Sequence, residues 1–166
     1  TDGWPLIWNV SGSESPMTMK IDSNNNLIVG GYHKAGCCSI RGWVSHIKKI
    51  AADGTIIWAK DFDFNTTAQD FIYDIVLDDQ DNIYFAGEIW YGTHLYGGPG
   101  SGDGTPYNDW MVGRISGDGV RDENFFHVYN ITGTDTARGI SIDRVNRRIY
   151  TVCLLYTSDA ADDETS

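Results

Sequence analysis

The residue types best suited to binding a ligand are gathered in one glycine-rich stretch, EIWYGTHLYGGPGSGDGTPYNDW, near the middle of the chain. Aromatic faces among polar neighbours can stack on sugar rings or contact a protein partner. Aromatic side chains more commonly pack against their own protein, so the sequence favours a packing role and keeps ligand binding as the alternative. The candidate binding residues are Trp90, Tyr91, His94, Tyr96, Tyr107 and Trp110.

Metal binding has weaker support in the sequence. The stretches DSNNN, from Asp22, and DDQDN, from Asp78, are similar to the start of a calcium loop but lack its glycine and its final glutamate. Both lie where a hairpin needs Asp and Asn for its turn. The histidines are dispersed, without a paired spacing that places two imidazoles on one ion. They are His33, His46, His94 and His127. We therefore expect no metal ion and no cofactor.

No motif marks a catalytic site. The chain has no nucleophile elbow and no metalloprotease signature, and no pair of acids is brought together by the spacing of its motifs. A chance pair of carboxylates could form a glycosidase site, but sequence spacing does not locate one. The stretch GGPGSGDG lacks the Gly-Lys-Ser/Thr ending of a phosphate loop. We therefore name no catalytic residue.

Composition restricts the class of protein further. The chain has 166 residues, 41% apolar and 21% charged, which is typical of one globular domain. Its net charge of -11 argues against a nucleic-acid partner, because phosphate binding needs clustered Lys and Arg. No apolar run approaches the roughly 18 residues of a membrane span. The first residues do not form a signal peptide, so we expect any export signal upstream of Thr1.

The cysteines do not form a disulfide framework. Cys37 and Cys38 are neighbours, and Cys153 lies far from both. Adjacent cysteines can close a strained disulfide, but two free thiols are the simpler interpretation, and the sequence leaves this question open.

Internal repeats are the most informative feature of the sequence. Three segments align, each with alternating apolar residues, an Asp, a polar turn and a second apolar strand. The three Asp residues are 56 and 65 residues apart: Asp22, Asp78 and Asp143. This pattern predicts the same β-hairpin three times. The three segments are MTMKIDSNNNLIVGGY, IYDIVLDDQDNIYFAGE and RGISIDRVNRRIYTV.

A second motif recurs between the hairpins. KIAADG and RISGDG each end one strand and turn into another, TIIWAKDF after the first and VRDENFFHVYN after the second. DGWPLIWNV, at the start of the chain, resembles the same turn and strand. The repeating unit is therefore four short antiparallel strands.

This layout is typical of a β-propeller blade. We predict an all-β fold, a partial β-propeller of about two and a half four-stranded antiparallel blades. Residues 1–152 divide into an outer strand (4–11), a blade (17–62), a second blade (71–130) and an inner hairpin (137–152). Propellers close with roughly four to eight blades. We therefore expect the remaining blades to belong to the same parent chain, or to a partner.

The motifs resemble a known family at this point. DDQDNIYFAG, read as Asp-x-x-x-Asn-hydrophobic-Tyr-x-x-Gly, with R-I-x-x-D-G and IIWAK, resembles the bacterial SBBP β-propeller repeats, and DGVRDENF is similar to delta-sixty repeats. The resemblance implies a secreted or cell-surface bacterial protein, hence an extracellular location, and supplies no catalytic residues. Two departures are the missing Gly in IDRVNRRIYTV and the long stretch from Glu88 to Asp109.

The sequence thus predicts a non-enzymatic repeat scaffold that binds a glycan or protein ligand, or mediates adhesion, through loops on one propeller face. One alternative is a quinoprotein-like dehydrogenase or another propeller enzyme, because Gly54 and Trp58 in GTIIW have the docking spacing of quinone-binding propellers. Glu123 stands at the matching position after Gly119, which argues against it. The other alternative is a carbohydrate-binding propeller.

The C-terminal segment 153–166 departs from the repeat. CLLYTSDAAD, from Cys153 to Asp162, resembles the translation of a transposon-end adapter used in sequencing libraries. We expect residues 153–166 to be non-native and the natural sequence to end near Val152.

Overall fold

The computed structural model describes residues 13–34, 42–64, 69–90, 108–129 and 134–156. Within these ranges it contains ten β-strands and no helix. The prediction of an all-β fold is therefore confirmed. The predicted outer strand, 4–11, lies outside the described residues.

Sheet A is an antiparallel meander of four strands. The order is β1-β2-β3-β4, so each strand pairs with its neighbour in sequence. Its strands cover the stretch in which the repeat pattern predicts the first four-stranded unit, residues 17–62. They are β1 (Glu14–Ile21), β2 (Leu27–Lys34), β3 (Trp43–Ile50) and β4 (Ile56–Phe62).

Sheet B combines a second meander with a hairpin. Its main order is β10-β9-β7-β6-β5, with β8 pairing on β7. The hairpin joins the meander through one parallel pair, Asn108 with Thr134, so sheet B is mixed and not purely antiparallel as predicted. The junction is this short because β9 packs mainly across β5, β6 and β7. The strands are β5 (Gln69–Leu77), β6 (Ile83–Trp90), β7 (Asn108–Ile115), β8 (Arg121–Tyr129), β9 (Thr134–Asp143) and β10 (Arg148–Tyr156).

The turn of each hairpin is built by the repeated aspartate. In the β1–β2 turn, Asp22 Oδ1 accepts the backbone N–H groups of Asn24 and Asn26 at 2.9 and 2.8 Å, and Oδ2 accepts the Asn26 side chain at 2.9 Å. Such bonds let Asp hold a turn in place of a backbone partner. Asp78 and Asp143 accept three equivalent bonds each. One residue in each turn has positive φ, two residues before the second strand in the first two hairpins and directly before it in the third: Asn25 (62°), Asp81 (59°) and Arg147 (56°).

The second predicted turn also recurs. Ala51 N–H donates to Thr55 O and Gly54 N–H to Ala51 O, while the β7–β8 turn makes the same pair of bonds around Ser116. The glycines that close these turns, Gly54 and Gly119, have φ of 93° and 76°, a region that favours glycine.

A β-bulge lies at the same position in the first strand of each hairpin. The pairing skips Met17 in β1, Tyr73 in β5 and Arg138 in β9. Opposite the first two bulges, glycine is required: a Cβ on Gly31 would lie 2.1 Å from Ser15 O, and one on Gly87 would lie 1.9 Å from Phe71 O. The repeated "GG" and "AG" in the sequence is explained by this close approach.

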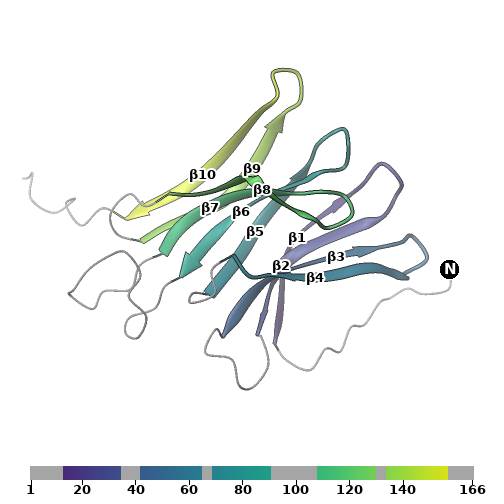
Figure 1. The fold of residues 1–166 in the computed structure, drawn as a ribbon, viewed down its shortest axis with the longest axis horizontal. Coiled ribbons are helices and arrows are strands. Elements are labelled where there is room, and N and C mark those ends of the chain that lie inside the picture. The colour runs from purple at the N-terminus through teal and green to yellow at the C-terminus, as the bar shows by residue number, and fades with distance from the viewer. Residues whose placement is uncertain (1–12, 35–41, 65–68, 91–107, 130–133, 157–166) are drawn as a thin grey trace, which may run out of the picture.

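The units stack in a regular way. Strand β5 packs against β1, β2 and β3, and β9 packs in the same manner against β5, β6 and β7. The five hairpin turns all lie on one side of the molecule, spread like a fan (Figure 1). One apolar cluster, including Ile47, Ile75 and Phe85, fills the space between sheet A and β5–β8. A second cluster, including Tyr84 and Ile140, lies between β5–β8 and the β9–β10 hairpin.

Polar contacts join one unit to the next. Asp74 on β5 accepts Thr18 Oγ1 from β1 at 2.8 Å and the Ile140 N–H from β9 at 3.1 Å. At the hairpin tips, Ser23 donates to Asp81, and Arg144 forms an ion pair with Asp79 at 3.3 Å. Neighbouring units are therefore held by matched contacts at their inner strands and at their tips.

Strand β10 continues past the predicted boundary at Val152. Leu154, Leu155 and Tyr156 pair with Thr136, Asp135 and Thr134 of β9. Cys153 faces Ala137 across the bulge, as Gly87 faces Ile72. The first residue of the segment 153–166 thus stands where the other two hairpins need glycine. The non-native origin of the segment stays a prediction.

Candidate functional site

The predicted aromatic site is described only in part. Tyr91, His94, Tyr96 and Tyr107 lie outside the described residues, as do Cys37 and Cys38. Trp90 ends β6 and is half-buried, opposite Gln69 on β5 and Asn108 on β7. The ends of β2 and β6 lie on the same side of the molecule, away from the hairpin turns (Figure 1).

Trp110 on β7 packs within the protein. Its ring stacks on Tyr129, with ring centroids 4.1 Å apart and planes inclined by 15°. It also packs against the buried cluster beneath the β9–β10 hairpin. Trp110 therefore has a structural role, and the described part of the predicted site leaves Trp90 as its candidate for ligand contact.

A polar cluster lies between strands β5, β6 and β9. Tyr73 Oη donates to Glu88 Oε1 at 2.6 Å, and Thr136 Oγ1 donates to Glu88 Oε2. The Arg138 guanidinium lies 4.0 Å from the centre of the Tyr73 ring. Burial, with the Glu88 carboxylate second, raises the pKa of Tyr73 far above its ordinary value, so the phenol stays protonated. The cluster ties β5, β6 and β9 together.

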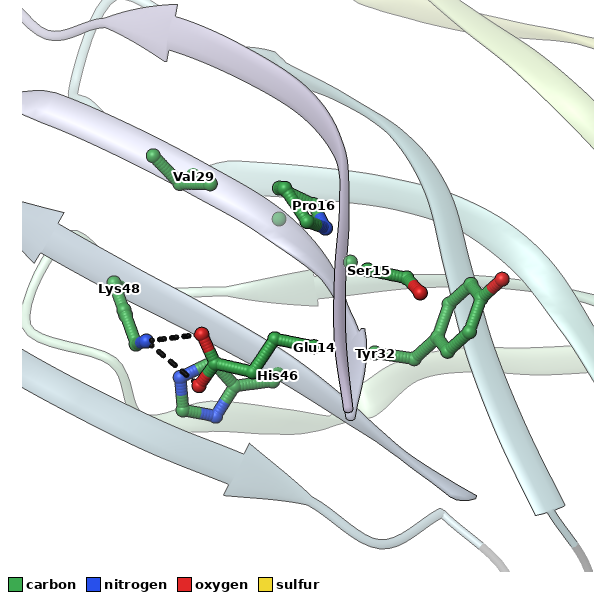
Figure 2. Close-up of a pocket in the computed structure, with 9 residues that line it drawn as sticks. Glu14, Ser15, Pro16, Val29, Tyr32, His46 and Lys48 are labelled. Atoms are coloured by element: carbon green, nitrogen blue, oxygen red, sulfur yellow. Dashed lines mark hydrogen bonds and ion pairs between the residues drawn. The ribbon is translucent and has the colours of Figure 1, made fainter. Parts of the chain in front are cut away.

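The face of sheet A that points away from sheet B carries a second polar group of residues. Lys48 Nζ lies 3.0 and 3.1 Å from the two carboxylate oxygens of Glu14, joining β3 to the start of β1. This ion pair borders a small pocket of about 40 Å³, also lined by Pro16, Tyr32 and His46 (Figure 2).

Beside this pocket, three potential ligand residues meet on adjacent strands. Asp61 Oδ1 on β4 lies 2.6 Å from His46 Nδ1 on β3 and 2.9 Å from His33 Nε2 on β2. The two imidazole rings are edge to face, with centroids 5.0 Å apart. We call His33, His46 and Asp61 the histidine cluster. One ligand atom from each residue lies within 4.8 Å of the other two.

The two histidines are mostly covered and Asp61 is open. The side chains of His33 and His46 are 16% and 17% exposed, against 53% for Asp61. Burial lowers the pKa of His46, although Asp61 acts in the opposite direction, so the imidazole is held neutral near pH 7. His46 Nε2 is buried and has no hydrogen-bond partner among the described residues.

The expectation that the histidines lie apart is wrong for His33 and His46. Their spacing of 13 residues carries no metal motif, and the strand pairing that brings them together depends on the length of the intervening segment. A signal was nevertheless present in the repeats. His33 aligns with Ile89 and His46 with Met111, so the first unit has imidazoles where the second has apolar residues.

The calcium-like stretches serve the turns. The carboxylates of Asp22 and Asp78 accept hydrogen bonds from the turn residues that follow them. Asp22 also forms an ion pair with Lys49 at 2.9 Å, and the side chain of Asp22 is 0% exposed.

The structure also explains the tryptophan of GTIIW, whose spacing from Gly54 is the one found in quinone-binding propellers. Trp58 Nε1 donates to Gly117 O at 3.2 Å, and Lys49 Nζ donates to the same carbonyl at 3.1 Å. Trp58 thus joins sheet A to the β7–β8 turn of sheet B.

The comparisons with known proteins identify no family. No protein-family model matches the chain, and the search of curated proteins gives no match either. Among the described residues, no helix has the length and apolar character to cross a membrane. The resemblance to bacterial propeller repeats therefore stays a hypothesis based on the motifs.

Proposed function

We propose that the chain is part of a β-propeller that acts as a non-enzymatic binding scaffold. In this proposal, sheet A and strands β5–β8 are successive blades, and β9–β10 is the inner hairpin of the next. The observation that carries the proposal is the repeated stacking: β9 lies on β5–β7 as β5 lies on β1–β3. A constant step from unit to unit is what a ring of blades requires.

The described polar residues support a scaffold more than an enzyme. Asp22, Asp74 and Asp78 are used to hold turns and join units, and Glu88 is closed off by Tyr73 and Thr136. Binding would then depend on the connections at the end where β2 and β6 finish, since loops on a rigid framework commonly carry function. The proposal of an extracellular or cell-surface location rests on the resemblance of the motifs to secreted bacterial repeats.

The contact of Trp58 with Gly117 accounts for the GTIIW motif, so no observation favours a quinoprotein over the scaffold. The proposed ligand class is a glycan, because the segment between β6 and β7 is rich in aromatic residues and glycine, and aromatic rings stack on sugars.

A glycan array probed with the labelled chain tests this function. We expect binding to a subset of glycans that is lost in the double variant Trp90→Ala and Tyr96→Ala. The matched control is Tyr150→Ala, because Tyr150 is an aromatic residue 52% exposed on β10, away from the β6 end. Circular dichroism confirms that each variant keeps its strands. Unchanged binding by the double variant, or no glycan bound by the parent chain, would contradict the proposal.

A further inference from the structure

The histidine cluster has the composition of a metal site. Imidazole nitrogen and carboxylate oxygen are preferred ligands of Zn²⁺ and its first-row neighbours, and three protein ligands leave open positions for water or another group. His33, His46 and Asp61 come from three adjacent strands, so the sheet itself sets their mutual positions. Sites built on strands hold their ligands more accurately than sites built on loops.

The distances between the potential ligand atoms are close to those on one ion. Zinc binds imidazole nitrogen at about 2.0–2.1 Å and carboxylate oxygen at about 2.0–2.2 Å, so two ligand atoms on one ion are at most about 4.2 Å apart. In the histidine cluster, Asp61 Oδ1 already lies within 2.9 Å of both ring nitrogens, and one ligand atom from each residue lies within 4.8 Å of the other two, slightly beyond that limit. A small side-chain adjustment is therefore enough to surround an ion.

The repeat shows that the fold does not need polar residues at these positions. The equivalents of His33, His46 and Asp61 in the second unit are Ile89, Met111 and Val128, as the strand pairing aligns them. In sheet A, three potential metal ligands thus stand at positions where the second unit has apolar residues. The apolar set builds the same four strands, so the strands themselves do not require His33, His46 and Asp61, which lie on the face of sheet A that no sheet of the described residues covers.

The surroundings can also support the ligands. When His46 Nδ1 holds a proton for Asp61, its Nε2 is buried without a described partner. An ion bound at Nδ1 moves that proton to Nε2, where a water in the adjoining pocket, or the Glu14 carboxylate that lines it, can accept it (Figure 2). The nearby charge of Lys48 is balanced by Glu14, which reduces its repulsion of a cation.

We propose that His33, His46 and Asp61 bind one divalent first-row transition-metal ion of the Zn²⁺ type at the face of sheet A that points away from sheet B. The ion is held by His33 Nε2, His46 Nδ1 and a carboxylate oxygen of Asp61, and water fills the remaining positions. This site does not depend on the glycan-binding proposal, because it lies on residues that take no part in that proposal.

Calorimetric titration of the full chain with Zn²⁺, after treatment with a chelator, tests the proposal. We expect one ion per chain, with affinity reduced at least about tenfold by His33→Ala or by His46→Ala. The matched control is His127→Ala, because His127 lies on β8 beside Phe125 and outside the histidine cluster, and we expect no change there. Absence of stoichiometric binding, or equal binding by the double variant His33→Ala and His46→Ala, would overturn the proposal.

Two further measurements keep the test valid if a histidine variant folds poorly. The side chain of Asp61 is exposed, so the variant Asp61→Asn should keep its strands. Zn²⁺ should then raise the Tm of the parent chain more than the Tm of this variant. Co²⁺ should give the d–d absorption of a nitrogen and oxygen site. A thiolate-to-cobalt charge-transfer band would assign the ion to cysteine and contradict the proposal, as would an equal Tm shift in both proteins.

Discussion

Sheet A and strands β5–β8 share one strand order, and the corresponding faces of the two differ in chemistry. In β5–β8 this face packs against sheet A and is apolar, with Phe85, Ile89 and Met111 buried. In sheet A the same face has no sheet of the described chain against it. Val29 matches Phe85 and is apolar as well, but His33 and His46 match Ile89 and Met111, and the polar residues Glu14, Lys48 and Asp61 lie near them.

The difference shows which residues build the unit and which respond to their neighbours. The turn aspartates, the bulges and the glycines opposite them are common to both units, because each hairpin has the same backbone path and the same close approach at its bulge. The face residues follow what they pack against. Near the hairpin turn the comparison is sharper still: Met19 and Ile21 are 67% and 69% exposed, whereas their equivalents Ile75 and Leu77 are buried.

The largest expected effect concerns a residue that both units share. Gly87→Ala should destabilise the protein by about 4 kcal/mol, beyond the usual range for overpacking, because the new Cβ meets a backbone carbonyl at 1.9 Å. The matched control is Gly139→Ala, where no atom lies within 4 Å of the added Cβ and we expect little change. Urea unfolding measures both. Equal stability of the two variants would mean that the bulge does not require glycine.

The second prediction compares two turn aspartates. Asp22→Asn should cost about 3 kcal/mol at pH 7, because it leaves Lys49 without its buried anion. Asp143→Asn should lower the free energy of unfolding by less than Asp22→Asn does, since the hydrogen bonds of the Asp143 turn are exposed. Burial alone would raise the pKa of Asp22, but hydrogen bonds from Asn26, Lys49 and Asn24 outweigh burial and lower it.

The pH dependence of Asp22 follows from that direction. A carboxyl whose pKa is lower in the folded state stabilises the protein above its unfolded pKa of about 3.9 and loses this contribution as pH falls toward the folded value. The gap in unfolding free energy between the parent chain and Asp22→Asn should therefore shrink from pH 7 to pH 3. A constant gap over this range would contradict the role assigned to the ion pair.

The third prediction exchanges residues between the two faces. Met111→His should destabilise the protein by about 2 kcal/mol, because it places an imidazole without a partner in a core position that is 0% exposed. The reverse change, His46→Met, should be nearly neutral without metal, since it replaces a half-buried polar group with an apolar one of similar size. Thermal unfolding in the presence of chelator compares them. Equal losses would show that the two faces are equivalent after all.

The last prediction concerns the reactivity of a thiol and leaves the stability of the fold unchanged. Cys153 stands at the position of Gly31 and Gly87, and burial, with the charge of Asp135 second, raises its pKa to about 11. At pH 8, alkylation of Cys153 should be about 100-fold slower than that of an ordinary cysteine and should accelerate as pH approaches 11. Mass spectrometry of the variant Cys37→Ser and Cys38→Ser follows this thiol. A rate equal to that in urea would contradict its burial.

Much of the architecture could be predicted from local patterns. The Asp-x-x-x-Asn turns, the Asp-Gly turns and the strands between them were all visible in the repeats, because each depends on residues close together in the chain. The single parallel pair between Asn108 and Thr134 was not predictable, since it arises where two separate units happen to touch. The packing role of Trp110 likewise depends on Tyr129, 19 residues away on another strand.

The histidine cluster marks the limit of such prediction. By itself the sequence determined an all-β chain of repeated four-stranded units, because alternation, turn residues and repeat spacing are local and act in every copy. Only the tertiary structure decided that His33, His46 and Asp61 share one place, and that Asp74 touches both neighbouring units. The physical reason is that strand register and the stacking of sheets are set by contacts between residues far apart in the chain, which no spacing records.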